Sequence, residues 1–325
     1  MGKVLFVSQN ALERAENLKA VWDAYGGEKE FRQGQENMAE AESEGFSVVV
    51  CDALPSRING KDKCKVVNIC HGITGNKVYG ADEDAEWFDA EAAMQTDFAI
   101  AASENSIPIV ARQLGIPEDR VLALGFPRTD AYFGDAQRFD ECFGFHVDRI
   151  YLYAPTFRND ELGGWLPKID WSKIDSLLED GEVMVVKRHY FTENEITRGY
   201  DMRNMRVVEI PPSLPRTPYL MSSDVLVTDY SSCMSDAYIM RTPVVLTIDD
   251  MAEYLADRPM YYTYPQTYCS RYIKAEGNEE LLVRVIREAA ENGMGATEMA
   301  YMNATAGACD GHSAERVCDL IWSLQ

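Results

Sequence analysis

Short apolar runs recur along the whole chain, and longer stretches with helical periodicity separate them. Residues 4–8 form the first run, residues 12–25 follow with the spacing of a helix, and glycines at 26 and 27 end that helix. Further apolar runs lie at residues 46–51, 66–70, 98–102, 121–124, 150–153, 183–186, 207–210, 225–228 and 244–248, and further helical stretches at 107–114, 171–179, 279–291 and 314–324. This alternation of strands and helices predicts an α/β fold with parallel sheets.

The character of the sequence changes between residues 132 and 148, where aromatic and charged residues replace the strand pattern. We expect a domain junction there, with one Rossmann-like domain at residues 1–147 and a second at 148–325. The last helix falls in the second range, and its packing back on the first domain stays an alternative. The expected architecture is two doubly wound domains that face each other. Ligands of such sheets bind beyond the carboxyl ends of the strands, so the polar residues that follow each strand are the first candidates for a site.

Composition excludes several functions. The 325 residues include 53 acidic and 31 basic side chains, and the formal charge of −22 argues against nucleic acid as a partner and against adhesion to an anionic membrane. The sequence shows no transmembrane segment. Its eight cysteines have neither a CxxC pair nor a zinc spacing, which indicates reduced thiols in a cytoplasmic protein. We expect no cofactor and no metal ligand set, and Mg²⁺ dependence stays open.

Two of the four histidines directly follow strong apolar runs. His71 ends a predicted strand and precedes Gly72, which would let a ligand approach the backbone closely. His189 ends another strand. If each histidine lies at the top of its own sheet, the two face each other across one cleft. The pattern alone leaves open the alternative that they are unrelated loop residues.

Other candidate side chains also follow predicted strands. Ser231 and Ser232 come after the strand at residues 225–228 and precede a helix, whose amino end would suit a phosphate group. An ordinary serine cap is the alternative. Despite the negative charge of the chain, basic residues cluster near strand ends, and such a pocket would suit a phosphorylated ligand. These residues are Arg128, Arg158, Lys187, Arg188 and Arg258.

Together these blocks resemble the CDP-glycerol glycerophosphotransferase family, the teichoic-acid primases and polymerases. The resemblance extends over roughly residues 65–320, and the blocks occur in the order of the family. They are His71-Gly72 with Lys77 and Gly80, residues 125–130, Tyr153 to Arg158 with Thr156, residues 187–189, the stretch from Ser223 to Ser232 followed by Asp236, residues 250–258, and residues 310–313 followed by Arg316. The resemblance implies a GT-B architecture with the active site between the domains, a CDP-alcohol donor bound mainly by the second domain, and an essential pair of histidines, His71 and His189.

The implied reaction is the transfer of glycerol phosphate, or ribitol phosphate, from a CDP-alcohol to an acceptor hydroxyl with release of CMP. We assign His71 as general base and His189, with Lys187 and Arg188, as stabiliser of the pyrophosphate charge, and the two histidine roles are interchangeable. The other candidates for substrate binding are Gly72, Lys77, Arg128, Thr156, Arg158, Asp229, Ser231, Ser232 and Arg258. A carboxylate beside pyrophosphate is repulsive, so we expect Asp229 to bind an alcohol hydroxyl or to orient a neighbour.

The expected partners are a CDP-glycerol or CDP-ribitol donor and a glycerol-phosphate-type or lipid-linked acceptor, used in the cytoplasm or at the inner face of the membrane. Contact with the membrane would then go through a partner protein. Two alternatives stay open. One is a GT-B glycosyltransferase that uses a nucleotide sugar, and the other is a non-catalytic GT-B module in wall-polymer assembly. Binding of CDP-alcohols rather than UDP- or GDP-sugars would separate the first alternative from the family reaction.

Overall fold

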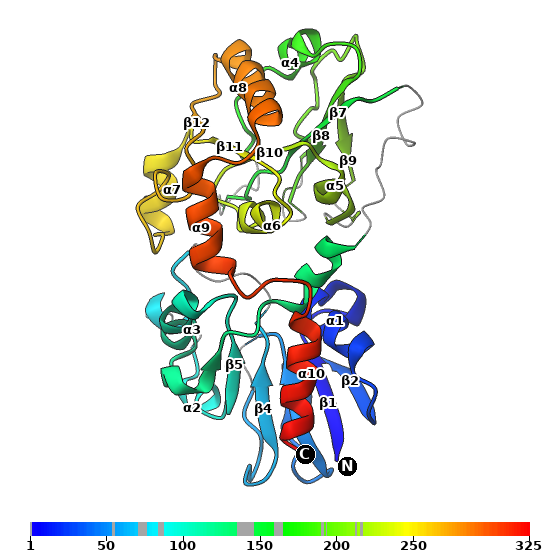
Figure 1. Ribbon diagram of the computed structural model, residues 1–325, viewed down its shortest axis with the longest axis vertical. Coiled ribbons are helices and arrows are strands. Elements are labelled where there is room, and N and C mark those ends of the chain that lie inside the picture. Colours follow the sequence, from blue (N-terminus) through cyan, green and yellow to red (C-terminus); the bar gives the residue numbers. More distant parts are fainter. Residues whose placement is uncertain are drawn as a thin grey trace. The chain divides into compact units, whose positions relative to one another are not determined.

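The computed structural model describes residues 2–53, 56–70, 77–83, 88–134, 146–158, 165–189, 192, 194–211, 213–214 and 217–325. The chain forms two compact units (Figure 1). Unit 1 comprises Met1–Gly134, Arg258–Tyr261 and Met302–Gln325, and unit 2 comprises Asp135–Asp257 and Tyr262–Tyr301. The chain therefore contributes three separate stretches to unit 1.

Unit 1 contains a six-stranded sheet in the order β2-β1-β3-β4-β5-β6, and all of its strand pairs are parallel. Its side chains alternate between two buried faces, as expected for a parallel sheet covered on both sides. Leu5 and Val7 of β1 pack on one face with Met38, and Phe6 contacts Trp22 of α1 on the other, with ring centroids 5.4 Å apart. The strands are β1 (Lys3–Ser8), β2 (Lys29–Gln33), β3 (Phe46–Cys51), β4 (Lys65–Asn68), β5 (Phe98–Ile100) and β6 (Val121–Leu122).

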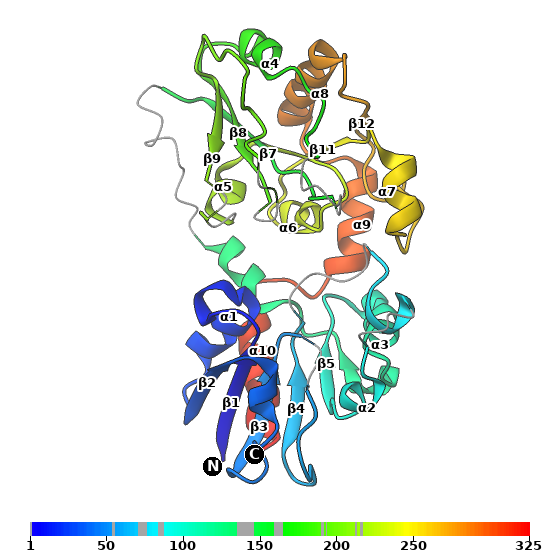
Figure 2. The ribbon, with the colours of Figure 1, turned by 180° about the vertical axis from the view of Figure 1, so that it is seen from behind.

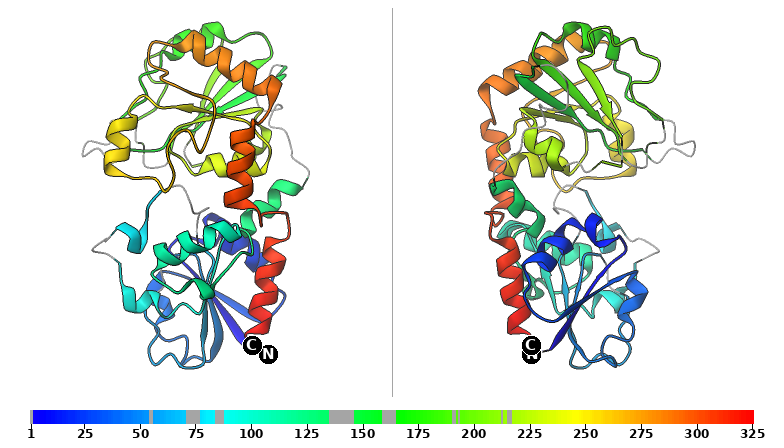
Figure 3. Two further views of the ribbon diagram at one scale, coloured as in Figure 1. Left: turned by 60° about the vertical axis from the view of Figure 1, so that its left-hand side comes forward. Right: turned by 90° about the vertical axis from the view of Figure 1, so that its right-hand side faces the viewer.

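The last helix of the chain completes unit 1. Trp322 of α10 stacks near Tyr25 at the end of α1, with ring centroids 4.7 Å apart, and the two chain termini lie beside each other (Figure 3). The helix expected at residues 12–25 is divided, because a 3₁₀ turn ends at Arg14 and α1 begins only at Glu16. The α-helices of unit 1 are α1 (Glu16–Ala24), α2 (Ala90–Ala93), α3 (Ile107–Leu114) and α10 (Ser313–Ser323), and its 3₁₀ turns are Leu12–Arg14, Gln35–Met38, Gly80–Glu83, Glu104–Ser106, Glu118–Arg120 and Pro127–Phe133.

Unit 2 contains a second parallel six-stranded sheet, in the order β12-β11-β10-β7-β8-β9. Helices α4 and α8 cover one of its faces, and α5 and α6 cover the other (Figures 1 and 2). Its strands are β7 (Arg149–Tyr153), β8 (Glu182–Lys187), β9 (Val207–Ile210), β10 (Val225–Thr228), β11 (Val244–Thr247) and β12 (Tyr272–Ile273). Its helices are α4 (Trp171–Leu177), α5 (Thr217–Ser222), α6 (Cys233–Ile239), α7 (Met251–Asp257) and α8 (Glu279–Asn292), and α9 (Ala296–Ala306) begins in unit 2 and ends in unit 1.

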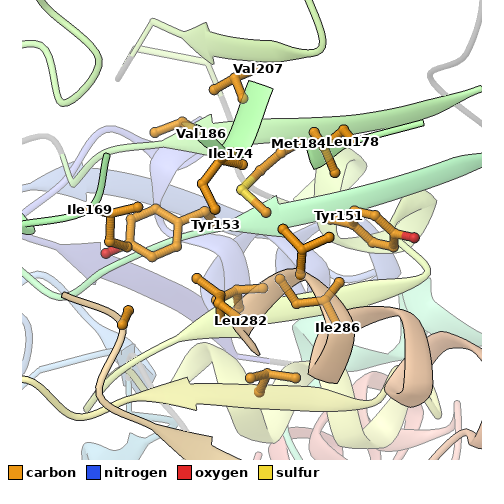
Figure 4. Close-up of a cluster of buried hydrophobic side chains, with 14 of the residues drawn as sticks. Tyr151, Tyr153, Ile169, Ile174, Leu178, Met184, Val186, Val207, Leu282 and Ile286 are labelled. Atoms are coloured by element: carbon orange, nitrogen blue, oxygen red, sulfur yellow. The ribbon is translucent and has the colours of Figure 1, made fainter. Parts of the chain in front are cut away.

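The core under α4 and α8 gives the sheet of unit 2 a rigid support. Tyr151 and Tyr153 of β7 point into this core, where Ile174 of α4 and Leu282 and Ile286 of α8 pack against them (Figure 4). Burial of an aliphatic or aromatic side chain of this kind contributes about 1.5–3 kcal/mol. The two parallel sheets with helices on both faces confirm the expected doubly wound α/β class.

Each sheet has one topological switch point, where the strand order reverses and consecutive loops diverge. In unit 2 the chain adds β8 and β9 on one side of β7 and then returns to place β10 on the other side. In unit 1 the switch point lies between β1 and β3. The crevice left between diverging loops at the carboxyl ends of such strands is where open α/β sheets bind ligands.

Candidate functional site

The switch point of unit 2 carries two of the sequence-predicted residues in direct contact. Thr156 lies in the loop after β7, and Asp229 follows β10 immediately. The backbone N–H of Thr156 donates a hydrogen bond of 2.7 Å to Oδ1 of Asp229. Both residues are buried, and the hydroxyl of Thr156 has no hydrogen-bond partner among the described residues. A buried hydroxyl at a ligand-binding edge is suited to an incoming polar group.

Arg158 lies at the switch point and contacts residues of the loops that follow β7, β10 and β11. Its Nη2 donates to Oδ2 of Asp229 at 2.9 Å, its Nε donates to Oδ2 of Asp250 at 2.7 Å, and its Nη1 donates to the carbonyl of Thr156 at 2.6 Å. A second bond from Nη2 reaches Oδ1 of Asp250 at 3.0 Å. Four of the five N–H donors of the guanidinium are thus engaged. Asp229 thus contacts both Thr156 and Arg158, and its expected role of orienting a neighbour stays a prediction.

The surroundings of Arg158 strengthen this network. The guanidinium lies 3.9 Å from the ring centroid of Trp165, and the Tyr230 hydroxyl donates to Oδ1 of Asp250 at 3.0 Å. Burial alone would lower the pKa of Arg158, but the carboxylates of Asp229 and Asp250 raise it, so the group stays charged. Burial alone would raise the pKa of Asp250, yet its bonds from Arg158 hold it below the ordinary value. The network is a largely buried ion cluster in which one arginine pairs with two carboxylates.

A small pocket of about 140 Å³ adjoins this network within unit 2. Five carboxylates line this pocket, and only two basic side chains do. The carboxylates belong to Asp229, Asp249, Asp250, Glu253 and Glu276, and the basic side chains to Arg158 and Lys168. The rest of the lining consists of Tyr153, Trp165, Leu166, Pro167 and Thr247. Burial raises the pKa of Asp249 above its ordinary value. Carboxylates in excess of basic groups disfavour phosphate here and suit hydrogen-bond donors such as hydroxyls.

The two serines precede α6 at the same switch point. The hydroxyl of Ser231 accepts a 3.3 Å hydrogen bond from the backbone N–H of Cys233, the first residue of α6. Ser232 occupies the cap position, but its side chain makes no capping bond. Thus Ser231 contributes the side-chain contact to the start of the helix, and both serines stand beside Asp229 and Tyr230 in the loop.

The neighbouring strand β8 ends in the predicted basic segment. Lys187 is its buried last residue, and its ammonium donates to the carbonyl of Arg188 at 3.3 Å. Nε of Arg188 lies 3.5 Å from Oε1 of Glu209 on β9, so this guanidinium is paired with a carboxylate. The ring of His189 stacks on the ring of Phe157, with centroids 4.6 Å apart. His189 therefore lies beside the loop that carries Thr156 and Arg158.

The predicted residues of unit 1 lie in two groups. The buried Arg128 places its Nε 3.8 Å from Oε2 of Glu16, and its backbone N–H donates to Asn17 Oδ1 at 3.1 Å. Asn17 in turn donates to the carbonyl of Cys70 at 3.0 Å. His71 and Gly72 lie outside the described residues, so their predicted roles stay predictions.

Lys77 and Arg258 form the second group. Lys77 forms an isolated antiparallel bridge with Met260, and the N–H of Val78 donates to the carbonyl of Pro259 at 3.0 Å. The segment Arg258–Tyr261 accordingly belongs to unit 1, although it follows the last helix residue of α7 directly.

Sequence reasoning did not single out three residues that the structure places at these edges. Ser8 donates to Oδ2 of Asp52 at 2.8 Å, and the two residues lie at the ends of β1 and β3, the switch point of unit 1. Phe157 supports His189 and was treated only as part of a larger block. For Asp52 a signal was present, since a carboxylate directly follows a strand, whereas nothing local distinguishes Phe157 from a core residue.

Two kinds of feature are absent from the described residues. No group of three or more His, Cys, Asp or Glu side chains there is arranged to hold a metal ion. No helix in the same part of the chain is long and apolar enough to cross a bilayer.

Similar proteins are found by sequence. The chain is 26% identical over 215 residues to the teichoic acid ribitol-phosphate polymerase TarL of Staphylococcus aureus, an alignment that covers 62% of this chain and 38% of TarL. It is 26% identical over 222 residues to the teichoic acid glycerol-phosphate primase of Bacillus subtilis, covering 65% of this chain and 57% of the primase. The matched regions therefore span between about a third and three fifths of the length of these two relatives.

A solved structure of the wall teichoic acid polymerase TagF superposes on 99% of this chain and 89% of its own, with a TM-score of 0.79 and 18% identity. This likeness confirms the GT-B-like fold with two Rossmann-like units. The model of the family described as CDP-glycerol:poly(glycerophosphate) glycerophosphotransferase matches residues 11–323, nearly the whole sequence. The chain belongs to this CDP-glycerol:poly(glycerophosphate) glycerophosphotransferase family.

Proposed function

We propose that the chain transfers glycerol phosphate or ribitol phosphate from a CDP-alcohol to a hydroxyl of a glycerol-phosphate-type or lipid-linked acceptor. The observation that carries the proposal is the contact of Thr156 with Asp229, because it joins two family blocks at the ligand-binding edge of unit 2. The names of the relatives, which are glycerol- and ribitol-phosphate primases and polymerases, support the same reaction class.

In the proposed reaction an acceptor hydroxyl oxygen attacks the phosphorus that carries the alcohol. A new P–O bond forms, the P–O bond to CMP breaks, and the hydroxyl proton passes to a histidine. We assign this proton to His71 and the pyrophosphate charge to His189 and Lys187, with the two histidines interchangeable. Positioning and charge stabilisation supply most of the rate in such phosphoryl transfers.

Unit 2 is the proposed donor side and unit 1 the proposed acceptor side. The hydroxyls of Thr156, Ser231 and Ser232 are the proposed donors to the phosphates. Arg158 is engaged with Asp229 and Asp250, so we assign it the ordering of the loops rather than direct phosphate contact. The acidic pocket beside it would then receive a hydroxyl-bearing part of the CDP-alcohol.

Thermal melting of the full chain with added ligands tests this proposal. A ligand that binds only the folded state raises the free energy of unfolding by about 2.7 kcal/mol at a hundredfold excess over its Kd. We expect stabilisation by CDP-glycerol or CDP-ribitol and by CMP, together with CMP release when an acceptor is supplied. Stabilisation by UDP-glucose or GDP-mannose instead would favour a glycosyltransferase, and no response to any of them would contradict catalysis by this chain.

A further inference from the structure

A buried asparagine of α1 joins two loops of unit 1. Asn17 is the second residue of this helix and is only 2% exposed. Its Oδ1 accepts the 3.1 Å bond from the N–H of Arg128, in the loop after β6, and its Nδ2 donates the 3.0 Å bond to the carbonyl of Cys70, after β4. One side chain therefore holds the backbones of two loops that belong to different strands of the sheet.

The backbone of Cys70 has a conformation that needs such support. Its φ is +51°, in the left-handed region that residues other than glycine adopt rarely. The N–H of Cys70 donates to Oδ1 of Asn68 at 2.9 Å, and the amide of Asn68 donates to the carbonyl of Ala53 at 3.0 Å. Because a conformation of this kind persists only where its surroundings determine it, Asn17 and Asn68 set the direction in which the chain leaves Cys70.

The loop that carries Arg128 is itself firmly anchored within unit 1. The N–H of Gly125 donates to the carbonyl of Ala101 at 3.0 Å, and the N–H of Phe126 donates to Sγ of Cys309 at 3.4 Å. The hydroxyl of the fully buried Thr129 donates to the carbonyl of Phe126 at 2.7 Å. Asn17 therefore holds Cys70 against a fixed part of the unit.

We propose that Asn17 is a positioning residue for the transfer reaction, and this inference rests on the proposed function. Cys70 directly precedes His71, the proposed general base, and Arg128 is a candidate for substrate binding. His71 lies outside the described residues, and Asn17 acts on the chain up to Cys70. By fixing both loops before a substrate arrives, Asn17 removes part of the cost of orienting the reacting groups.

Two substitutions separate the two hydrogen bonds of Asn17. Asn17→Asp keeps an oxygen for the N–H of Arg128 but loses the donor to the carbonyl of Cys70, whereas Asn17→Leu loses both bonds at a similar side-chain size. Asn37→Asp is the matched control, because the side chain of Asn37 also donates to backbone carbonyls of unit 1, those of Gln33 and Gly34.

Steady-state kinetics of the full chain with CDP-glycerol and glycerol 3-phosphate measure the effect on the reaction. We expect Asn17→Asp to lower kcat by about 10- to 100-fold, the range for a small misplacement of a catalytic group, with KM for glycerol 3-phosphate within about threefold of wild type. Asn17→Leu should lower kcat and also raise this KM, because the loop of Arg128 loses its bond as well. Equal kcat in the Asn17 variants and in Asn37→Asp would overturn the proposal.

Proton NMR of the four histidine rings makes the result independent of turnover. His71→Ala identifies the signal of His71. We expect both Asn17 variants to shift or broaden this signal, while Asn37→Asp leaves it unchanged and the signals of the other three histidines stay at their wild-type positions in all variants. An unchanged His71 signal in Asn17→Leu would overturn the proposal, and so would the loss of all four native signals in both Asn17 variants, since Asn17 would then act in folding alone. A wild-type chain that turns over no CDP-alcohol would count against the proposed function only, and the NMR comparison would still decide the role of Asn17.

Discussion

The imidazole of His189 lies on the phenyl ring of Phe157, with ring centroids 4.6 Å apart and ring planes inclined by 29°. The two residues follow neighbouring strands, β8 and β7, of the same parallel sheet. Stacked rings at this distance favour one orientation of the imidazole. Phe157 is therefore a positioning residue for the histidine that we assign to the pyrophosphate.

Replacement of Phe157 tests this support. We expect Phe157→Leu to lower kcat by about tenfold while KM for the CDP-alcohol changes less, because the imidazole loses its preferred plane but the binding groups stay in place. Phe157→Tyr keeps the ring and should restore most of the rate. Equal losses in the leucine and tyrosine variants, measured by CMP release, would argue against a stacking role.

Most of the turnover should depend on His71 and His189. We expect His71→Ala and His189→Ala each to reduce turnover by about 100-fold or more, since proton transfer and charge stabilisation both depend on imidazole. Melting temperatures should match wild type. His312→Ala is the control, because His312 is an exposed residue on the surface of unit 1. Wild-type turnover in either of the first two variants would remove that histidine from the mechanism.

Replacement of two adjacent aspartates should change the free energy of unfolding differently. Asp250→Asn removes a carboxylate that accepts two bonds from Arg158, so the free energy of unfolding should fall by about 1–3 kcal/mol. Asp249→Asn removes a charge whose burial is unfavourable, as the raised pKa of Asp249 indicates, so stability should stay equal or rise. Chemical denaturation at neutral pH measures both. A larger loss for Asp249→Asn than for Asp250→Asn would contradict the ion cluster.

Glu182, at the amino end of β8, should stabilise the protein in a pH-dependent way. Burial alone would raise the pKa of Glu182, but Arg287, with Nε 2.9 Å from Oε1, and further bonds lower it to about 2. Because the folded-state pKa lies below the ordinary value near 4.5, the unfolded chain binds more protons between these values. The stabilisation by Glu182 is full above about pH 4.5 and is lost as the pH falls toward 2. The stability difference between wild type and Glu182→Gln should therefore shrink over this interval in acid-denaturation curves.

Gly125 should tolerate no side chain. Its φ is +81°, and a Cβ atom would overlap the hydroxyl of Ser313 and the carbonyl of Ala308. We expect Gly125→Ala to lower the free energy of unfolding of unit 1 by about 2 kcal/mol or more, from backbone strain and the clash together. Gly60→Ala is the control, because Gly60 also has a positive φ but no atom lies within 4 Å of its Cβ position. A similar loss of stability in both variants would show that backbone strain, and not the clash with Ser313 and Ala308, is the cause.

The sequence predicted those strands that contain a run of apolar residues. The bounds of β3, β9 and β10 match the expected apolar runs. β10 is buried at every residue, as expected for a strand covered on both faces. β9 is an edge strand with a half-buried Glu209, and its three aliphatic residues still marked it. The sequence missed β2 because Lys29–Gln33 is an edge strand with four half-buried residues and one exposed residue, and so it has no apolar run. The helix α9 was missed because its polar and apolar residues do not separate into two faces.

The candidate site could be predicted only in part. Residues that follow strands were recognisable, and Thr156, Arg158 and Asp229 do meet at one edge of the sheet. Their partners were not recognisable, because the contacts of Arg158 with Asp229 and Asp250 join loops that are separated in sequence by whole strands and helices. The sequence alone shows that Arg158 lies near loops that are predicted to bind phosphate. Only the fold shows that its donors are engaged by two carboxylates and a backbone carbonyl.

The return of the chain to unit 1 at α10 also bears on the order of events during synthesis. Residues up to Gly134 leave the ribosome before those of unit 2, but α10, which packs on α1 through Trp322 and Tyr25, emerges after unit 2. A nascent chain can therefore form the sheet of unit 1 early, yet one side of α1 stays exposed to water and to chaperones until α10 has emerged. Unit 1 is therefore begun before unit 2 and completed only after the residues of unit 2 have been synthesised.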